Sequence, residues 1–150
     1  MIERRTTAID RKIRLDARRS VLGELLDRLN MDLTDAGCPE EKRTEIGICA
    51  EEIFVNIASY AYRDMTGDVT IEERIYQDSP QEKVLTLVFK DSGIPFNPLA
   101  REKPDVTLPE SERRIGGLGI YMVKNMTDRA WYEYQDDINC LYLEYRWQQM

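Results

Sequence analysis

The sequence predicts an α+β fold, a two-layer sandwich in which helices cover one face of a mostly antiparallel sheet. Apolar residues recur at helical spacing in two long segments, and strand-like runs come in adjacent pairs that suit hairpins. Helices and strands do not alternate in the regular pattern of a parallel α/β sheet. The 150 residues contain no Pro-, Gly- or Ser-rich linker, so we expect one domain over residues 1–150.

The first half of the chain is expected to hold an edge strand and two helices. Glu3–Ile9 fits the strand, and a helix is expected from about Asp16. Its apolar residues follow helical spacing at Val21, Leu22, Leu25, Leu26 and Leu29. After the break "DAGCPEE", a second helix is expected to start just after Pro39 and to run to about Tyr62, with apolar residues on most of its circumference.

The second half is expected to hold two hairpins separated by an irregular segment and a helix. After a turn at Arg63–Asp68, the expected elements are strands Val69–Tyr76 and Lys83–Asp91, helix Gly117–Met126, and strands Arg129–Gln135 and Cys140–Trp147 joined through "DDIN". Four prolines make Ile94–Arg114 difficult to fold regularly. Because long irregular segments in small domains are usually functional, we interpret it as a candidate lid.

Charge and composition exclude several classes of function. The chain has 21 basic and 28 acidic residues, a net charge of −7, which would repel nucleic acid. The basic run Ile9–Arg19 is interpreted either as a local patch or as a solvated face. The absence of histidine excludes histidine-based triads and a phosphohistidine relay.

The sequence also predicts a cytoplasmic protein without a membrane partner. No apolar stretch approaches the roughly 20 residues of a membrane span, and "MIERRTTAID" lacks the apolar core of a signal peptide. The three cysteines, Cys38, Cys49 and Cys140, are far apart and lack metal-ligand spacing. We therefore expect them to be reduced thiols.

Glu52 and Asn56 stand out as polar residues within the apolar second helix. Four residues apart, they lie on one face about one turn from each other. A carboxylate and an amide on a buried helix need either hydrogen-bond partners or a polar cavity. On its own, this pair is as well explained by a structural network as by a functional site.

Two glycine-containing segments follow further along the chain. Asp91 ends an apolar strand, and Gly93 follows it in "DSGIPFNP"; such a pair often marks only a turn. The segment "IGGLGIYMVKNMTD" places three glycines at the start of a predicted helix. These glycines make either a tight turn or a site where unpaired backbone N–H groups meet an anion, for which phosphate is a natural ligand.

The order of these motifs resembles the ATP-binding domain shared by gyrase, Hsp90-type chaperones, histidine kinases and mismatch-repair ATPases, known as the GHKL or Bergerat fold. "EIFVN" matches its E-x-x-x-N helix, "DSGIPFNP" its D-x-G box and "GGLGIYMV" its glycine-rich box. The resemblance runs from about Leu15 to Arg146 and is closest to the stand-alone bacterial branch, the anti-sigma-factor serine kinases. No Walker lysine follows the glycines.

The resemblance implies a role for each matching residue at a site for ATP and Mg²⁺. Asp91 would accept the adenine amino group, Gly93 would make room for the base, and Phe96 would belong to the same pocket. Asn56 would bind Mg²⁺ through its amide oxygen, the type of ligand that this cation prefers.

The remaining implied roles concern phosphate binding and catalysis. Glu52 would be the general base that takes the proton from a water or a protein serine hydroxyl. Arg113 or Arg114 is interpreted either as a contact of the γ-phosphate or as exposed surface charge. The residues that would offer backbone amides to the phosphates are Gly116, Gly117, Leu118 and Gly119.

The resemblance implies an ATP- and Mg²⁺-dependent regulatory serine/threonine protein kinase that acts as an anti-sigma factor in a partner-switching pathway. Its phosphoacceptor would be the serine of an anti-sigma-factor antagonist, with a sigma factor as its other partner. The sequence does not decide whether the chain forms a homodimer. One alternative is a non-catalytic module whose protein binding depends on the nucleotide, and another is an interaction domain without a nucleotide. The chain departs from the family pattern at the second glycine of the D-x-G-x-G box, and Ser59 or Tyr60 stands where a histidine is common.

Overall fold

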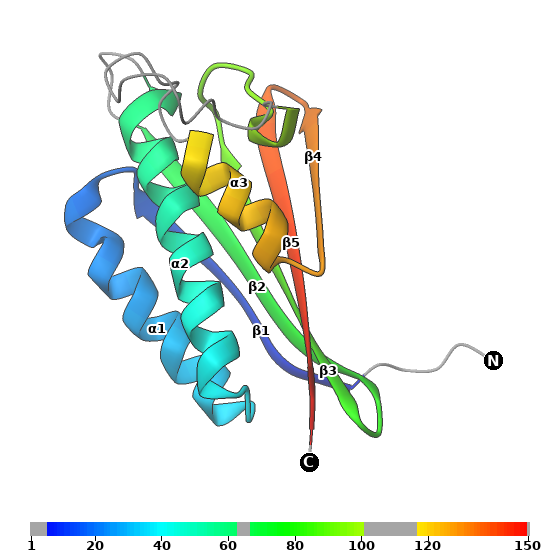
Figure 1. Ribbon diagram of the computed structural model, residues 1–150. Helices are drawn as coiled ribbons and strands as arrows, with labels where there is room; N and C mark the ends of the chain where they lie inside the picture. The colour runs from blue at the N-terminus through cyan, green and yellow to red at the C-terminus, as the bar shows by residue number, and fades with distance from the viewer. Residues whose placement is uncertain (1–5, 63–66, 101–116, 150) are drawn as a thin grey trace.

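The protein is an open antiparallel sheet with helices packed against one of its faces, as the computed structural model in Figure 1 shows. The structure describes residues 6–62, 67–100 and 117–149. Within them, five strands occur in the spatial order β1-β2-β3-β5-β4, and every neighbouring pair is antiparallel. The strands are β1 (Thr6–Asp16), β2 (Asp68–Ser79), β3 (Glu82–Asp91), β4 (Arg129–Gln135) and β5 (Ile138–Gln148). The predicted α+β class is confirmed.

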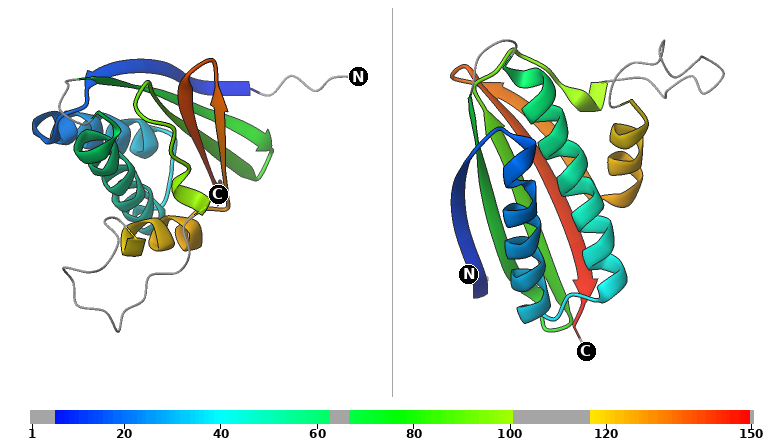
Figure 2. Two further views of the ribbon diagram at one scale, coloured as in Figure 1. Left: turned by 90° about the horizontal axis from the view of Figure 1, so that it is seen from above. Right: turned by 90° about the vertical axis from the view of Figure 1, so that its left-hand side faces the viewer.

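Three α-helices of the described residues form the second layer. They are α1 (Leu22–Asp35), α2 (Glu40–Asn56), which continues as a π-helical turn at Ile57–Ala61, and α3 (Gly117–Met126). Figure 2 shows them on one side of the sheet, with α2 between α1 and α3. No helix in the described part of the chain has the length and apolar character needed to cross a membrane.

The core lies between α2 and the three central strands. Ile46, Ile53 and Phe54 of α2 are completely or almost completely buried, as are the inward-facing residues of β2, β3 and β5. The helix α2 is buried in the centre of its layer because its apolar residues occur on several sides of the helix. Its C-terminal end consequently lies over the ends of β3 and β5, where the polar residues of the predicted site are found.

The start of the fold differs from the expectation. The first strand, described from Thr6, continues to Asp16 instead of ending at Ile9, and α1 begins at Leu22 instead of about Asp16. Residues 3–5 of the expected strand lie outside the described part. Alternation explains the difference, because Ile9, Ile13 and Leu15 are partly buried while the charged residues between them are exposed. The basic run is therefore largely a charged edge strand, which supports the solvated interpretation.

The last hairpin is also tighter than expected. Its turn consists of Asp136 and Asp137, both with positive φ angles of 55° and 64°, as in the turns that suit two-residue hairpins. Ile138 and Asn139 therefore belong to β5 and not to the linker "DDIN". Of the candidate lid Ile94–Arg114, residues 101–114 lie outside the described part, which shows a short 3₁₀ turn at Pro98–Ala100.

Candidate functional site

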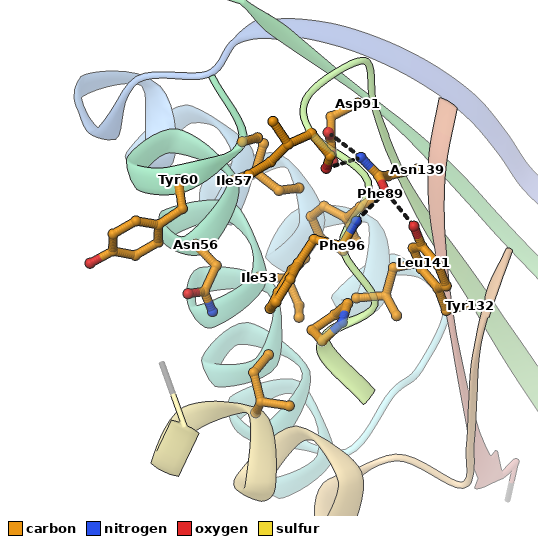
Figure 3. Close-up of a pocket in the computed structure, with 14 residues that line it drawn as sticks. Ile53, Asn56, Ile57, Tyr60, Phe89, Asp91, Phe96, Tyr132, Asn139 and Leu141 are labelled. Carbon is orange, nitrogen blue, oxygen red and sulfur yellow. Dashed lines mark hydrogen bonds between the residues drawn. The ribbon is translucent and has the colours of Figure 1, made fainter. Parts of the chain in front are cut away.

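A cavity of about 360 Å³ lies between the C-terminal half of α2 and the ends of β3, β4 and β5 (Figure 3). Most of its wall is apolar, and the residues that form this part include Ile53, Ile57, Phe89, Ile94, Phe96, Ile120 and Leu141. Its polar groups come from Asn56, Tyr60, Asp91, Tyr132 and Asn139. An apolar slot with a few polar groups is typical of a small-molecule site.

Asp91 and Asn139 form the most buried polar pair of the cavity. They face each other across β3 and β5, and their exposed fractions are 8% and 5%. Asn139 Nδ2 donates to Asp91 Oδ1 at 3.0 Å, and the backbone N–H of Gly93 donates to the same oxygen at 2.9 Å. Burial raises the pKa of Asp91, while the hydrogen bonds from Gly93 and Asn139 partly offset this effect.

Asn139 also connects this carboxylate to the loop that follows β3. Its Nδ2 donates to the carbonyl oxygen of Ile94 at 3.0 Å, and its Oδ1 accepts hydrogen bonds from the backbone N–H of Phe96 at 3.0 Å and from the Tyr132 hydroxyl. Sequence reasoning missed Asn139 because it was assigned to the linker. A signal was present, since Asn139 occupies the first of the alternating inward positions that Leu141 and Leu143 continue.

The same loop is attached to the end of α2. The N–H of Ile94 donates to the carbonyl oxygen of Ala61 at 3.1 Å, and a Cβ at position 93 would overlap this carbonyl group. Gly93 is therefore needed for the close approach of two backbone segments. The Tyr62 hydroxyl, which the sequence did not single out, accepts from Ser92 N–H at 2.8 Å.

Glu52 and Asn56 lie on the side of α2 that turns toward α3. Asn56 Nδ2 donates to Glu52 Oε1 at 2.9 Å, which leaves the amide oxygen of Asn56 for another partner. Both residues are half-buried. Burial raises the pKa of Glu52; the hydrogen bond from Asn56 lowers it, and the charge of Glu51 raises it. Asn56 also lines the cavity. Glu52 does not line it, and its carboxyl group lies against the first turn of α3.

The helix predicted after the glycine-rich segment is α3, which begins at Gly117. Gly119 in its first turn lies against the Glu52 carboxylate, because a Cβ at position 119 would overlap the carboxyl group. The backbone of Gly117 and Leu118 belongs to the same turn. Arg113, Arg114 and Gly116 lie outside the described residues.

The arrangement has the donor and acceptor groups that a nucleotide and a hard cation need. A flat base fits an apolar slot with a carboxylate, and a helix N-terminus favours an anion. Among the described residues, no group of three or more His, Cys, Asp or Glu side chains could hold a metal ion. The amide oxygen of Asn56, which has no hydrogen-bond partner among the described residues, fits Mg²⁺ of the kind that is bound by one or two protein ligands together with substrate phosphates.

Comparison with known proteins finds a matching family model and similar sequences. The sequence model of the histidine kinase-like ATPase domain matches residues 15–145. "Serine-protein kinase RsbW" of Listeria monocytogenes serovar 1/2a (strain ATCC BAA-679 / EGD-e) is 25% identical over 115 residues, which cover 73% of this chain and 70% of that protein. The protein of the same name from Bacillus mycoides (strain KBAB4) is 26% identical over 110 residues, or 67% of this chain and 62% of that protein.

Proposed function

Because the chain belongs to the histidine kinase-like ATPase family, whose model matches residues 15–145, we propose that it is an ATP- and Mg²⁺-dependent regulatory serine/threonine protein kinase. One observation carries this proposal. A buried carboxylate at one end of an apolar cavity occurs together with a carboxylate and an amide that lie next to a glycine-rich helix start. These are the groups that binding and transferring a phosphoryl group from a nucleotide requires.

In this proposal the adenine base occupies the apolar slot and Asp91 accepts its exocyclic amino group. Gly93 and Phe96 belong to the same part of the site, since the N–H of each is used to fix the Asp91–Asn139 network. The buried position of Asp91 strengthens a charge-assisted hydrogen bond because water is excluded from it.

The phosphates would then lie toward the first turn of α3. Gly117, Leu118 and Gly119, together with Gly116 and Arg114 by resemblance, would contact them. Asn56 would hold Mg²⁺ through its amide oxygen, and the cation would neutralise part of the phosphate charge.

Glu52 would act as the general base in phosphoryl transfer. As a serine hydroxyl attacks the γ-phosphate, its proton would pass to the Glu52 carboxylate, and ADP would leave. The raised pKa of Glu52 supports this role because it brings the proton affinity of the carboxylate closer to neutral pH. Asn56 would hold this carboxylate in place through its 2.9 Å hydrogen bond.

The proposed partners rest on the resemblance to the anti-sigma-factor serine kinases, and the name of the relatives, serine-protein kinase, supports the choice of a serine as phosphoacceptor. The phosphoacceptor would be an anti-sigma-factor antagonist, and the chain would sequester a sigma factor after the antagonist is phosphorylated. A non-catalytic module that binds proteins according to its nucleotide is the alternative. It is favoured by the close packing of Glu52 against Gly119, which restricts access to the proposed base.

The test uses the purified chain and the proteins that it captures from its source cells with ATP or with ADP. Incubation with Mg²⁺ and γ-labelled ATP is expected to label a captured protein on serine or threonine. The chain is then expected to release either the labelled protein or a second captured protein. ATP binding without any transfer, but with a nucleotide-dependent set of captured proteins, would support the binding module instead. The absence of ATP binding would contradict both.

A further inference from the structure

We propose that Asn139 is a positioning residue that makes the cavity selective for a base that carries an amino group at C6, as adenine does, over one that carries a keto oxygen there, as guanine does. It would do so by fixing one oxygen of Asp91 and the backbone of Ile94 and Phe96. This inference rests on the proposed function, because it concerns how the same cavity distinguishes adenine from guanine nucleotides. The side chain acts through Asp91 and the loop, without touching the ligand.

The hydrogen-bond inventory of Asn139 supports an indirect role. A carboxamide has two N–H donors and an oxygen that accepts two hydrogen bonds. The donors reach Asp91 Oδ1 and the Ile94 carbonyl oxygen, both at 3.0 Å, and the oxygen accepts from Phe96 N–H and the Tyr132 hydroxyl. Every position is therefore used within the protein, and Asn139 has none left for a base.

The consequence for Asp91 is that its two oxygens are not equivalent. Oδ1 accepts from both Asn139 and Gly93, whereas no donor from another described residue reaches Oδ2. Oδ2 is therefore the acceptor left for a ligand. An amino group donates to it, but the keto oxygen of guanine at the same place would oppose a carboxylate oxygen and be repelled.

Asn139 also favours the charged form of this carboxylate. Its hydrogen bond lowers the pKa of Asp91 and so opposes the larger, raising effect of burial. Figure 3 shows that Asn139 stands between Asp91 and Tyr132, and the hydroxyl of Tyr132 completes the network from β4. A buried network of this kind keeps its geometry only while each member is satisfied.

The first test is calorimetry with ADP and with GDP on wild type, Asn139→Ala and Tyr132→Phe, below the unfolding temperature of each. Asn139→Ala is expected to lower ADP affinity about ten- to hundredfold, with much less change for GDP, because only the C6 amino group of adenine depends on the fixed carboxylate. Tyr132→Phe is expected to lower ADP affinity a few-fold, and it carries the test if Asn139→Ala does not fold. Tyr134→Phe is the matched control, since its exposed hydroxyl lies on the same strand and contacts Asp137 at 3.4 Å.

Asn139→Asp separates positioning from a purely structural role. At alkaline pH two carboxylates would face each other, but at lower pH the pair shares a proton, which restores a donor to Asp91 Oδ1. The ratio of variant to wild-type ADP affinity is therefore expected to rise as pH falls from about 8 to about 5.5. The ratio is used because protonation of ADP itself changes the affinities of variant and wild type alike and therefore cancels.

Three results would overturn the inference alone: wild-type affinity in Asn139→Ala, equal losses for ADP and GDP, or a ratio for Asn139→Asp that does not change with pH. A wild type that binds neither nucleotide would instead remove the proposed function, and the inference with it. The two failures are therefore distinguished by the wild-type titration.

Discussion

Gly119 in the first turn of α3 lies directly against the carboxylate of Glu52 on α2. A Cβ at position 119 would overlap the carboxyl carbon and both oxygens of Glu52. The position of the proposed base is therefore coupled to the position of the proposed phosphate-binding helix. A side chain at position 119 would have to displace either the Glu52 carboxylate or the first turn of α3.

The first prediction is that Gly119→Ala lowers phosphoryl transfer by about 10²-fold, since a displacement of about 1 Å can have this effect on a catalytic group. The control is Gly47→Ala on α2, where a Cβ would meet nothing within 4 Å. This substitution is expected to leave transfer unchanged and to raise the free energy of unfolding by about 0.5–1 kcal/mol, because alanine is the better helix former. Transfer of labelled phosphate and urea unfolding measure the two effects. Normal transfer by Gly119→Ala would show that the contact with Glu52 has no catalytic importance.

The second prediction concerns Asp91. Asp91→Ala leaves the amino group of a bound adenine unpaired in a buried position, which costs about 1–3 kcal/mol, or about ten- to hundredfold in ATP affinity. Asp27→Ala on the exposed face of α1 is the control and is expected to bind ATP as wild type does. Calorimetry measures both. Unchanged ATP affinity in Asp91→Ala would contradict the assignment of this carboxylate to the base.

The third prediction concerns the cation. Asn56→Ala is expected to abolish the tightening of ATP binding by Mg²⁺ and to leave binding in EDTA comparatively intact, because it removes the proposed oxygen ligand. Titrations of ATP with Mg²⁺ and with EDTA separate these effects, with the exposed Asn30→Ala as control. If Asn56→Ala weakens ATP binding in Mg²⁺ and in EDTA to the same extent, Asn56 supports the structure of the site and does not bind the cation.

The fourth prediction concerns a buried carboxyl group outside the cavity. Glu73 of β2 is 2% exposed and lies near Asp32 and Arg28 of α1 and Arg11 of β1, whose Nε is 3.0 Å from Asp32 Oδ2. Burial, followed by the hydrogen bond and charge of Asp32, raises the pKa of Glu73 from 4.5 to about 8. The folded chain thus binds this proton more tightly than the unfolded chain. Its contribution to the free energy of unfolding is complete below pH 4.5 and is lost as pH rises through about 8.

Glu73→Gln is expected to remove most of this pH dependence, so that the variant exceeds wild type in stability by about 1–3 kcal/mol above pH 8, where wild type has a buried charge without a sufficient partner. Urea unfolding between pH 5 and 9 is the measurement. The control is Glu72→Gln, whose carboxylate lies 2.8 Å from Lys90 Nζ, since a surface ion pair of this kind adds little. A parallel decrease of stability with pH in wild type and Glu73→Gln would contradict the prediction.

Much of this arrangement was visible in the sequence because it depends on local patterns. Residues four apart on one helix share a face whatever the rest of the fold does, so the Glu52–Asn56 pair needed only the correct helix. The strand end at Asp91 and the helix start at Gly117 were likewise marked by turn residues.

Other features depend on which strands become neighbours, and the sequence does not state this. Asn139 stands at the first inward position of an alternating apolar pattern, and Glu73 interrupts one. Each pattern indicates a buried polar group but not its partner. Asn139 meets Asp91 only because β5 pairs with β3, 48 residues away, and Glu73 meets Asp32 because α1 packs over β2. The end of β1 was placed too early, at Ile9 instead of Asp16, because charged residues on an edge strand obscure its alternation.

The last prediction distinguishes the kinase from the nucleotide-dependent binding module. Glu52→Gln keeps the size of the side chain and can still accept the hydrogen bond from Asn56, but it cannot take a proton. It is therefore expected to keep ATP affinity within a few-fold and to lose phosphorylation of the captured partner by about 10²–10⁴, the range for one general base. Glu51→Gln, the neighbouring exposed carboxylate, is the matched control and is expected to retain transfer. Equal transfer by wild type and Glu52→Gln would exclude Glu52 as the base, whereas no transfer by either, with partner capture still dependent on ATP, would identify the chain as the binding module.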